Sequence, residues 1–309
     1  MSDTARWTRP FGSASADGWD VVIDDAVDGW AHTSLRVVTL EAGDSRTVHA
    51  EEWEHVVVPL SGSVAVVAVA ADASDGVVGE VVLAGRASVF SGATDVVYAA
   101  RDTALTVTAH DGPARVAVCG ARAAVRHTPA FRHVAAADVP VELRGAGVAS
   151  REVRNFGTPG VLDADSIIAC EVVTPAGNWS SYPPHKHDEE RPGVETQLEE
   201  IYYFEVQHEG GAAAANGADP VGYQRVYGTD ERPIEVLAEV RSGDVVLVPH
   251  GWHGPAMAPP GYDLYYLNVM AGPGQERAWI ICDDPAHGWV RDTWSTQQVD
   301  PRLPLGGTR

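Results

Sequence analysis

The stretch SSYPPHKHDEE places two histidines, His185 and His187, on either side of Lys186, the single lysine of the chain. Successive side chains of a β-strand point to opposite faces, so the two imidazoles point the same way and Lys186 points the other way. Two imidazoles on one face can converge on a metal ion. An HxH pair alone also fits an ordinary hydrogen-bonded pair, so the prediction depends on further ligands.

Further candidate ligands follow in two strand-like segments. The segment DVVLVPHGWHGPAM offers His250 and His253 behind a valine-rich run, and LEEIYYFEV offers Glu199 or Glu200. Nitrogen ligands with one carboxylate suit zinc, iron, manganese or nickel, and the lack of thiolates disfavours a closed structural zinc site. We predict one divalent ion, with zinc, manganese and iron as the candidates. The predicted ligands are His185, His187, Glu200 and His253.

Strand alternation favours Glu200 over Glu199 as the carboxylate ligand. If Glu200 faces the metal, the residues that share its face are Tyr202, Phe204 and Val206, which suit an apolar barrel interior. If Glu199 faces the metal instead, Glu205 and Gln207 turn inward, and burying those polar groups is costly.

The segments that carry these residues have the pattern of short strands. The 31 glycines and 20 prolines punctuate runs rich in valine and aromatic residues, which is typical of an all-β protein. In the first half, strands are predicted at 33–43, 55–69, 76–85, 88–92, 95–100, 104–110 and 114–122. In the second half, they are predicted at 166–175, 199–207, 222–228, 234–240, 244–250 and 263–272.

Residues 127–150 change to small and polar types with two prolines, which indicates a crossing between two units. We predict two tandem β-sandwiches or barrels, residues 1–140 and 141–309. The first unit has no HxH pair and is expected to be metal-free and structural. The tail, with Trp289 and Trp294, is expected to wrap onto the body before fraying.

The charge and composition of the chain exclude some classes of binding partner. A formal charge of −21 argues against nucleic acid and anionic membranes, which both attract clustered cations. No apolar run reaches the about 20 residues that a membrane span needs. The first residues, MSDTARWTRPFGSASADGWD, lack the apolar stretch of a secretory signal, so a cytoplasmic protein is expected. Three cysteines without a CxxC pattern are expected to be buried thiols.

The candidate ligands resemble the two motifs of the cupin superfamily, an HxH with a glutamate and a later G-D-x-x-x-x-P turn with a histidine. The second motif stands here as Gly243, Asp244, Pro249, Gly251 and His253. The chain departs from the usual spacing, because twelve residues separate His187 from Glu200, which an inserted loop would explain. The resemblance implies two cupin-type barrels, a bicupin.

Longer blocks resemble the 5-deoxy-glucuronate isomerase family of inositol catabolism. They are WSSYPPHKHD, LEEIYYFEV, YQRVY, DVVLVPHGWHGPAMAPPGYDLYYLNVMAGP and PAHGW. The resemblance implies a metal-dependent aldose–ketose isomerase that converts 5-deoxy-D-glucuronate to 2-deoxy-5-keto-D-gluconate. Similarity to the related hexosulose-uronate ketol-isomerases could be aligned to favour Glu199 as the ligand, so Glu199 stays the alternative.

Such an isomerisation moves hydrogen between C1 and C2 while negative charge develops on the adjacent oxygens, which a divalent ion stabilises. Glu199, if it is not a ligand, and His250 are the candidate proton carriers, along with a tyrosine of the two Tyr-Tyr pairs. A hydride shift would need no base. His250 is equally compatible with a plain loop histidine.

The substrate also carries a carboxylate, for which Arg225 is the first candidate and Lys186 the second. Alternation alone puts Lys186 on the outer face, paired with a neighbouring acid. Tyr182, Tyr202 and Trp252 are expected to line the sugar pocket.

Two other functions remain open from the sequence. A two-barrel cupin oxygenase with iron(II) would consume oxygen, and a non-catalytic sugar-binding cupin would lack a reactive metal. A small sugar acid is the expected partner in the preferred function, and assembly into a homo-oligomer is possible.

Overall fold

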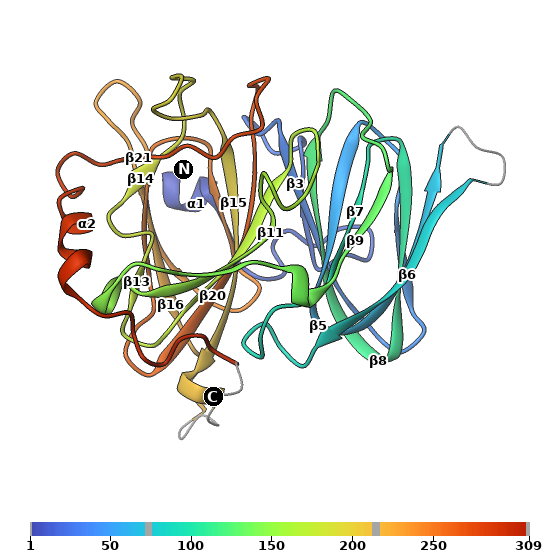
Figure 1. The fold of residues 1–309 in the computed structure, drawn as a ribbon, viewed down its shortest axis with the longest axis horizontal. Coiled ribbons are helices and arrows are strands. Elements are labelled where there is room, and N and C mark those ends of the chain that lie inside the picture. Colours follow the sequence, from blue (N-terminus) through green and yellow to red (C-terminus); the bar gives the residue numbers. More distant parts are fainter. Residues whose placement is uncertain (1, 72–75, 212–216, 307–309) are drawn as a thin grey trace.

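The computed structural model describes residues 2–71, 76–211 and 217–306. Two β-sandwich units lie side by side, and helices form only short segments (Figure 1). These are α1 (Asp3–Trp7), α2 (Val290–Thr293) and the 3-10 segments η1 (Ala136–Asp138), η2 (Gly147–Ala149), η3 (Glu209–Gly211) and η4 (Trp294–Thr296). No helix in the described part of the chain is both long and apolar enough to cross a membrane.

The first unit is an antiparallel sheet that folds around its own apolar core. Its main path is β2 (Val21–Ile23), β3 (Thr33–Leu40), β8 (Thr103–Arg122), β5 (Trp53–Ala70), β7 (Val96–Ala99) and β9 (Phe131–Val134). Two further strands, β4 (Ser45–Val48) and β6 (Val77–Arg86), pair with β8 and β5. Alternate residues of the long strands β5 and β8 fill the interior with valine and alanine.

The second unit packs a seven-stranded sheet against a six-stranded one. The seven-stranded order is β1 (Thr8–Arg9), β18 (Val245–Val248), β15 (Glu199–His208), β20 (Tyr262–Ala271), β12 (Ile168–Thr174), β11 (Arg151–Gly157) and β10 (Val141–Arg144). The other contains β17 (Glu235–Val240), β16 (Gly222–Tyr227), β19 (Trp252–Met257), β14 (His185–Lys186) and β21 (Cys282–Asp283), with β13 (Trp179–Ser180) paired to β19.

The seven-stranded sheet lies between the core of the second unit and the first unit, so both of its faces are covered (Figure 1). On β15, Tyr203 and Glu205 point to the first unit, where Arg115 of β8 lies 2.7 Å from the Glu205 carboxylate. Tyr202 and Phe204 therefore point to the opposite side, into the second unit, as strand alternation requires.

Buried ion pairs also join the two units. Arg86 of β6 forms a bidentate contact with Glu171 of β12, and the Tyr265 hydroxyl donates to the same carboxylate at 2.6 Å. Arg154 is fully buried beside them, with its guanidinium 2.7 Å from Glu152 and 3.7 Å from Glu171. Burial by itself would raise the pKa of Glu171, but the Arg86 charge and hydrogen bond lower it below its ordinary value.

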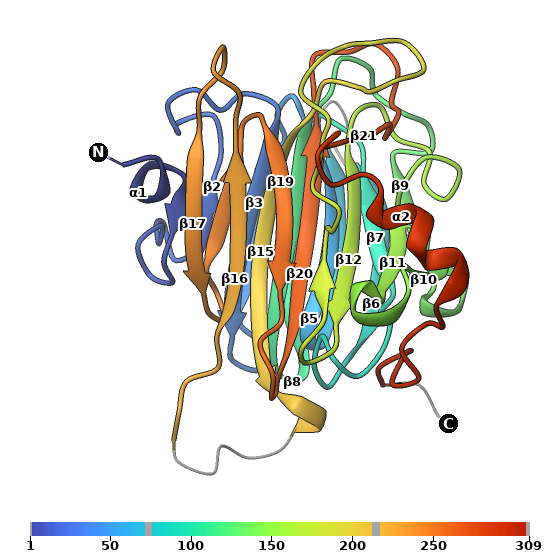
Figure 2. The ribbon, with the colours of Figure 1, turned by 90° about the vertical axis from the view of Figure 1, so that its left-hand side faces the viewer.

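Strands β2 to β9 form the sheet of the first unit, and strands from β10 onward form the two sheets of the second unit, with one exception at the N-terminus. Strand β1 pairs with β18 of the second unit, and α1 packs against β17 (Figure 2). The Thr4 hydroxyl and the Asp3 carboxylate accept the backbone N–H groups of Leu237 and Glu235 at 3.2 and 3.0 Å. Residues 3–9 therefore belong structurally to the second unit.

Most predicted strands are present, and residues 88–92 are the exception. That segment is a turn, in which the backbone N–H and the hydroxyl of Ser91 both donate to the Ser88 carbonyl, at 3.0 and 2.7 Å. The serine side chains thus satisfy backbone groups that a strand would pair. The tail forms α2 and η4 against the second unit rather than only an extended wrap.

Candidate metal centre

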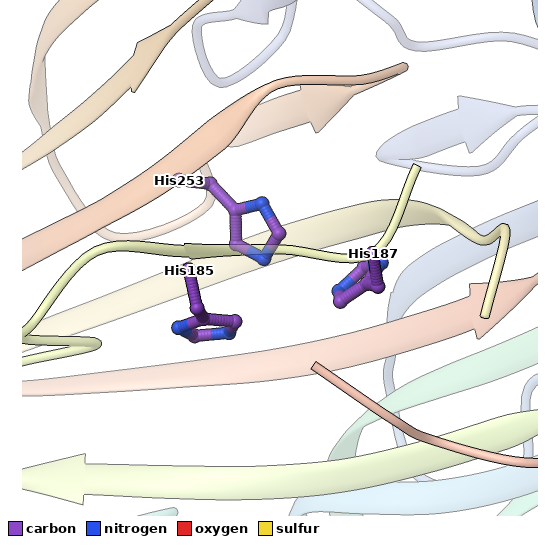
Figure 3. A group of neighbouring side chains, drawn as sticks. All are labelled: His185, His187 and His253. Atoms are coloured by element: carbon purple, nitrogen blue, oxygen red, sulfur yellow. The ribbon is translucent and has the colours of Figure 1, made fainter. Parts of the chain in front are cut away.

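Three histidines of the second unit form a compact buried group. His185 on β14 is the direct register partner of His253 on β19, and His187 follows two residues later on the same face as His185 (Figure 3). One ring nitrogen from each lies within 4.8 Å of the others. The three side chains are 8, 1 and 1% exposed, so this polar cluster is shielded from solvent.

The carboxylate of Glu200 completes the group from β15 in the opposite sheet. Its Oε2 lies 3.1 Å from Nε2 of His187 and 3.1 Å from Nε2 of His253. The structure thus brings together the four side chains that the sequence singled out as ligands. The parity argument placed Glu200 on this face because Tyr202 and Phe204 needed the same apolar interior.

The orientation of the imidazoles fits a metal ion. Nδ1 of His187 lies 3.2 Å from the Leu198 carbonyl, and Nδ1 of His253 lies 3.1 Å from the Gly251 carbonyl. These contacts place a proton on Nδ1 of both rings, so Nε2 is the nitrogen that faces Glu200 and the centre of the group. Nε2 of His253 is buried and hydrogen-bonds to no described protein atom. The three-histidine group could therefore hold a metal ion.

Charges in the group are strongly coupled. Burial, followed by repulsion from His253 and His187, lowers the pKa of His185 well below its ordinary value. Burial opposes charge on Glu200, yet its contacts with His187 and His253 lower its pKa to about 2. The pKa of His187 is raised, because its hydrogen bond and attraction to Glu200 outweigh burial. The carboxylate is ionised, as a ligand must be.

Glu199 lies on the other face of β15 and makes no contact with this group. Its Oε1 accepts the backbone N–H groups of His32 and Thr33, both at 2.7 Å, and the Thr33 hydroxyl at 2.9 Å, while Oε2 accepts the Ala31 N–H at 3.2 Å. The predicted proton carrier Glu199 is thus tied to the first unit.

His250 also lies outside the three-histidine group. It is half-buried at the end of β18, beside Arg232 and Asp188. Burial, followed by the Arg232 charge, lowers its pKa. Among the described residues, it has no ring contact with the three imidazoles, which contact one another.

Lys186 and Trp252 lie together on the face opposite the imidazoles. The ammonium of Lys186 lies 2.6 Å from Asp188 and 2.8 Å from Glu195, and 5.6 Å from the centre of the Trp252 ring. The lysine is therefore neutralised by two acids, both from the loop inserted between His187 and Glu200. The structure does not bring either predicted substrate-binding residue to the imidazole face.

Arg225 is on the exposed face of β16, where Gln224 and Val226 point inward. Its guanidinium lies 4.4 Å from the centre of the Tyr227 ring and 3.7 Å from Glu235. The predicted carboxylate anchor is thus separated from the three histidines by its own sheet, because the side chains of β16 alternate.

The two predicted tyrosines lie at different depths. Tyr202 is 1% exposed, and its ring centre is 6.2 Å from that of His253 and 5.0 Å from that of Tyr266. Tyr182 is half-buried, 6.0 Å from the ring of His287, beside a groove of about 210 Å³. Tyr202 and Tyr266 therefore form the interior wall next to the imidazoles.

One buried cation near the group was missed from the sequence. Arg151 begins β11 and is 5% exposed, and no carboxylate of the described residues lies within ion-pair distance of it. It shares a face of its strand with Val153, which pairs through Val172 with Tyr266. Arg151 therefore faces the same interior as the imidazoles. Arg151 directly follows the segment 127–150 that was predicted to be a crossing, and no sequence motif marked it.

Comparison with known proteins agrees with this architecture. A sequence profile of the KduI/IolB family matches residues 7–290. A 5-deoxy-glucuronate isomerase of Bacillus velezensis is 35% identical over 285 residues, covering 91% of this chain and 97% of that protein. The enzyme of the same name from Geobacillus kaustophilus is 47% identical over 178 residues, and this alignment spans 58% of this chain and 59% of the relative.

Solved structures show the same fold. An IolB-like protein from Salmonella typhimurium superposes with a TM-score of 0.77 at 35% identity, over 92% of this chain and 98% of that one. Oxalate decarboxylase from Lactobacillus farciminis superposes with a TM-score of 0.60 at 12% identity, over 90% and 88% of the two chains, a likeness of fold alone. The predicted all-β bicupin fold is confirmed, and the chain belongs to the KduI/IolB family.

Proposed function

We propose that this protein is a metal-dependent 5-deoxy-glucuronate isomerase of inositol catabolism, which converts 5-deoxy-D-glucuronate to 2-deoxy-5-keto-D-gluconate. The observation that carries the proposal is the convergence of His185, His187, His253 and Glu200 in a buried interior. Relatives aligned over nearly their whole length bear the name of this enzyme, which supports the same reaction here.

The proposed ligands are these three imidazoles and the Glu200 carboxylate. A divalent ion, when bound, supplies Lewis-acid stabilisation for the negative charge that develops on the oxygens of C1 and C2. The protein's part is to hold three imidazoles and one carboxylate rigidly and away from water. The Leu198 and Gly251 carbonyls help by fixing two of the rings.

Two phenols are the protein groups best placed to contact the sugar oxygens. Burial raises the pKa of Tyr202 and Tyr266, so both keep their protons at neutral pH. The Tyr266 hydroxyl is 2.5 Å from the Ser180 hydroxyl, which orients it. Protonated phenols donate hydrogen bonds and are poor bases. With Glu199 and His250 elsewhere, this supports transfer of hydrogen from C2 to C1 without exchange with solvent.

We further propose that Arg151 anchors the substrate carboxylate. Its guanidinium donates to the Ala149 carbonyl at 3.0 Å and stacks 5.6 Å from the Trp294 ring centre, which fixes its direction. A buried guanidinium without a carboxylate partner is a strong anion site, because the desolvation cost is already incurred. In a protein with formal charge −21, such a site is needed to hold a sugar acid.

The reaction itself is the direct test. The purified protein, stripped of metal and reloaded separately with zinc, manganese or iron(II), is given 5-deoxy-glucuronate in deuterated water. We expect ketose with at least one metal, without oxygen uptake and without deuterium at C1. No ketose with any of the three metals would overturn the isomerase proposal, and oxygen consumption would point to an oxygenase. Ketose with deuterium at C1 would overturn only the hydride route.

A further inference from the structure

The first unit has a cavity of its own, far along the chain from the three histidines. It measures about 360 Å³ and lies between β2, β3, β4 and the start of β5. Its polar lining includes Arg36, Arg46 and His55. Its apolar lining includes Trp19 and Trp53, which are 6 and 8% exposed. The volume falls in the range typical of small-molecule sites.

Strand alternation directs polar groups into this interior. On β3, Ser34 and Arg36 share a face with Val38, which belongs to the core of the first unit. On β5, His55 shares a face with the core residue Val57. Polar side chains therefore replace apolar ones at one end of an otherwise apolar interior.

Two of these buried groups have no partner among the described protein atoms. His55 is 2% exposed and Ser34 is 1% exposed, yet neither Nδ1 of His55 nor the Ser34 hydroxyl makes a hydrogen bond. Such groups are costly to bury, so a further hydrogen-bond partner, a water molecule or a ligand, is expected beside them. Gly120 leaves room beside them, because a Cβ there would lie 2.2 Å from the Ser34 hydroxyl.

The charges of the cavity favour a neutral ligand. Two guanidinium groups, from Arg36 and Arg46, face three carboxylates, those of Asp17, Asp24 and Glu51. Arg36 is already paired with Asp24 at 3.3 Å. Burial, followed by the Arg36 charge, lowers the pKa of His55 to about 3, so its imidazole is neutral and both donates and accepts. The cavity thus offers both donors and acceptors and carries no excess positive charge.

This pattern matches hydroxyl groups, which donate and accept at the same atom, while the two tryptophans supply apolar walls for the C–H faces of a sugar. The cavity does not match a metal, since the group of histidines and acids with metal-binding spacing in the described chain is His185, His187 and His253. We propose that the first unit binds a neutral polyol of about monosaccharide size in the cavity lined by Arg36, Glu51 and His55.

The proposal does not depend on the isomerase function, and binding to the whole protein tests it. Metal-loaded protein is titrated with D-glucose and with D-sorbitol, by calorimetry and ligand-observed NMR, and in parallel with D-glucuronate and inorganic phosphate. We expect saturable binding of a neutral polyol that persists in His253→Ala. Loss of polyol binding in that variant would assign it to the metal centre and overturn the proposal.

Two cavity variants and a matched control locate the site. His55→Phe keeps an aromatic ring but removes the two ring nitrogens. Glu51→Gln changes an exposed residue at the rim of the cavity, so this variant is expected to fold. Each should weaken polyol binding about ten-fold, the loss of one hydrogen bond, while Glu80→Gln on the exposed face of β6 should not. The proposal would be overturned if the protein bound no polyol, or if glucuronate or phosphate bound more tightly at this cavity. It would also be overturned by unchanged polyol affinity in Glu51→Gln, and in His55→Phe where that variant folds.

Discussion

Glu199 and Glu200 are adjacent on β15 and point to opposite faces, so substituting each by glutamine separates folding from metal binding. Glu199→Gln should lower the free energy of unfolding and leave metal content unchanged. Glu200→Gln should remove metal. The two variants differ by one residue position and have the same net charge, so each is the control for the other.

The expected loss for Glu199→Gln follows from its four contacts. The amide oxygen can keep the three donors that Oε1 accepts, from His32 and from the backbone and hydroxyl of Thr33. The amide nitrogen then faces the Ala31 N–H, so one hydrogen bond is lost. A hydrogen bond to a charged acceptor is worth about 1 kcal/mol more than one to a neutral acceptor, so the three kept bonds weaken by about 3 kcal/mol together, and the lost bond adds about 2 kcal/mol, for a sum of about 5 kcal/mol.

Denaturant unfolding of the metal-free proteins and metal analysis of the loaded proteins measure the two effects. A stable Glu199→Gln protein that has lost its metal, together with a destabilised Glu200→Gln protein that keeps it, would refute the face assignment. A Glu199→Gln loss well below 1 kcal/mol would show that the contact between β15 and the first unit contributes little to stability.

Three further predictions concern the site and the interface. His185→Ala and His253→Ala should each lose metal and activity while the circular dichroism spectrum stays native, whereas the control His250→Ala should keep its metal. Metal retention in both His185→Ala and His253→Ala would remove these residues from the site. Arg151→Met should raise KM for the acid substrate at least ten-fold but not for an analogue with a neutral alcohol in place of the carboxylate, and an equal effect on both would contradict the anchor role. The lowered pKa of Glu171 means that its stabilisation is present above pH about 4.5 and is lost as the pH falls through its lower folded value, so the pH dependence of unfolding should be shallower in Glu171→Gln.

Strand periodicity accounts for what the sequence could predict of the centre. His185, His187 and Glu200 were placed on a common interior because side chains alternate and because Tyr202 and Phe204 demand an apolar face. Lys186 was placed on the outer face by the same rule. Its partner Glu195 could not be foreseen, since the fold of the inserted loop sets that contact.

The placement of Arg225 and of Glu199 could not be predicted, because strand periodicity is ambiguous there. In YQRVY, tyrosine and arginine occupy one face and glutamine and valine the other, and neither face is clearly the apolar one; the structure turns Arg225 outward. Glu199 was a plausible base until its partners were known, and these come from residues 166 to 168 positions earlier in the chain. Contacts at such sequence distances depend on how the sheets stack, which no local pattern encodes.

The short pairing of β1 with β18 has a consequence for how the protein is made. Residues 3–9 leave the ribosome long before β18 is synthesised, so this N-terminal segment has no partner strand while the first unit folds. It must then pair with β18 late in folding. Deleting the N-terminal segment, or cutting the chain at residue 140, would leave β18 as an exposed edge strand, which favours aggregation between chains. The second unit produced by itself should therefore stay free of aggregation only when a peptide of residues 3–9 is added in trans.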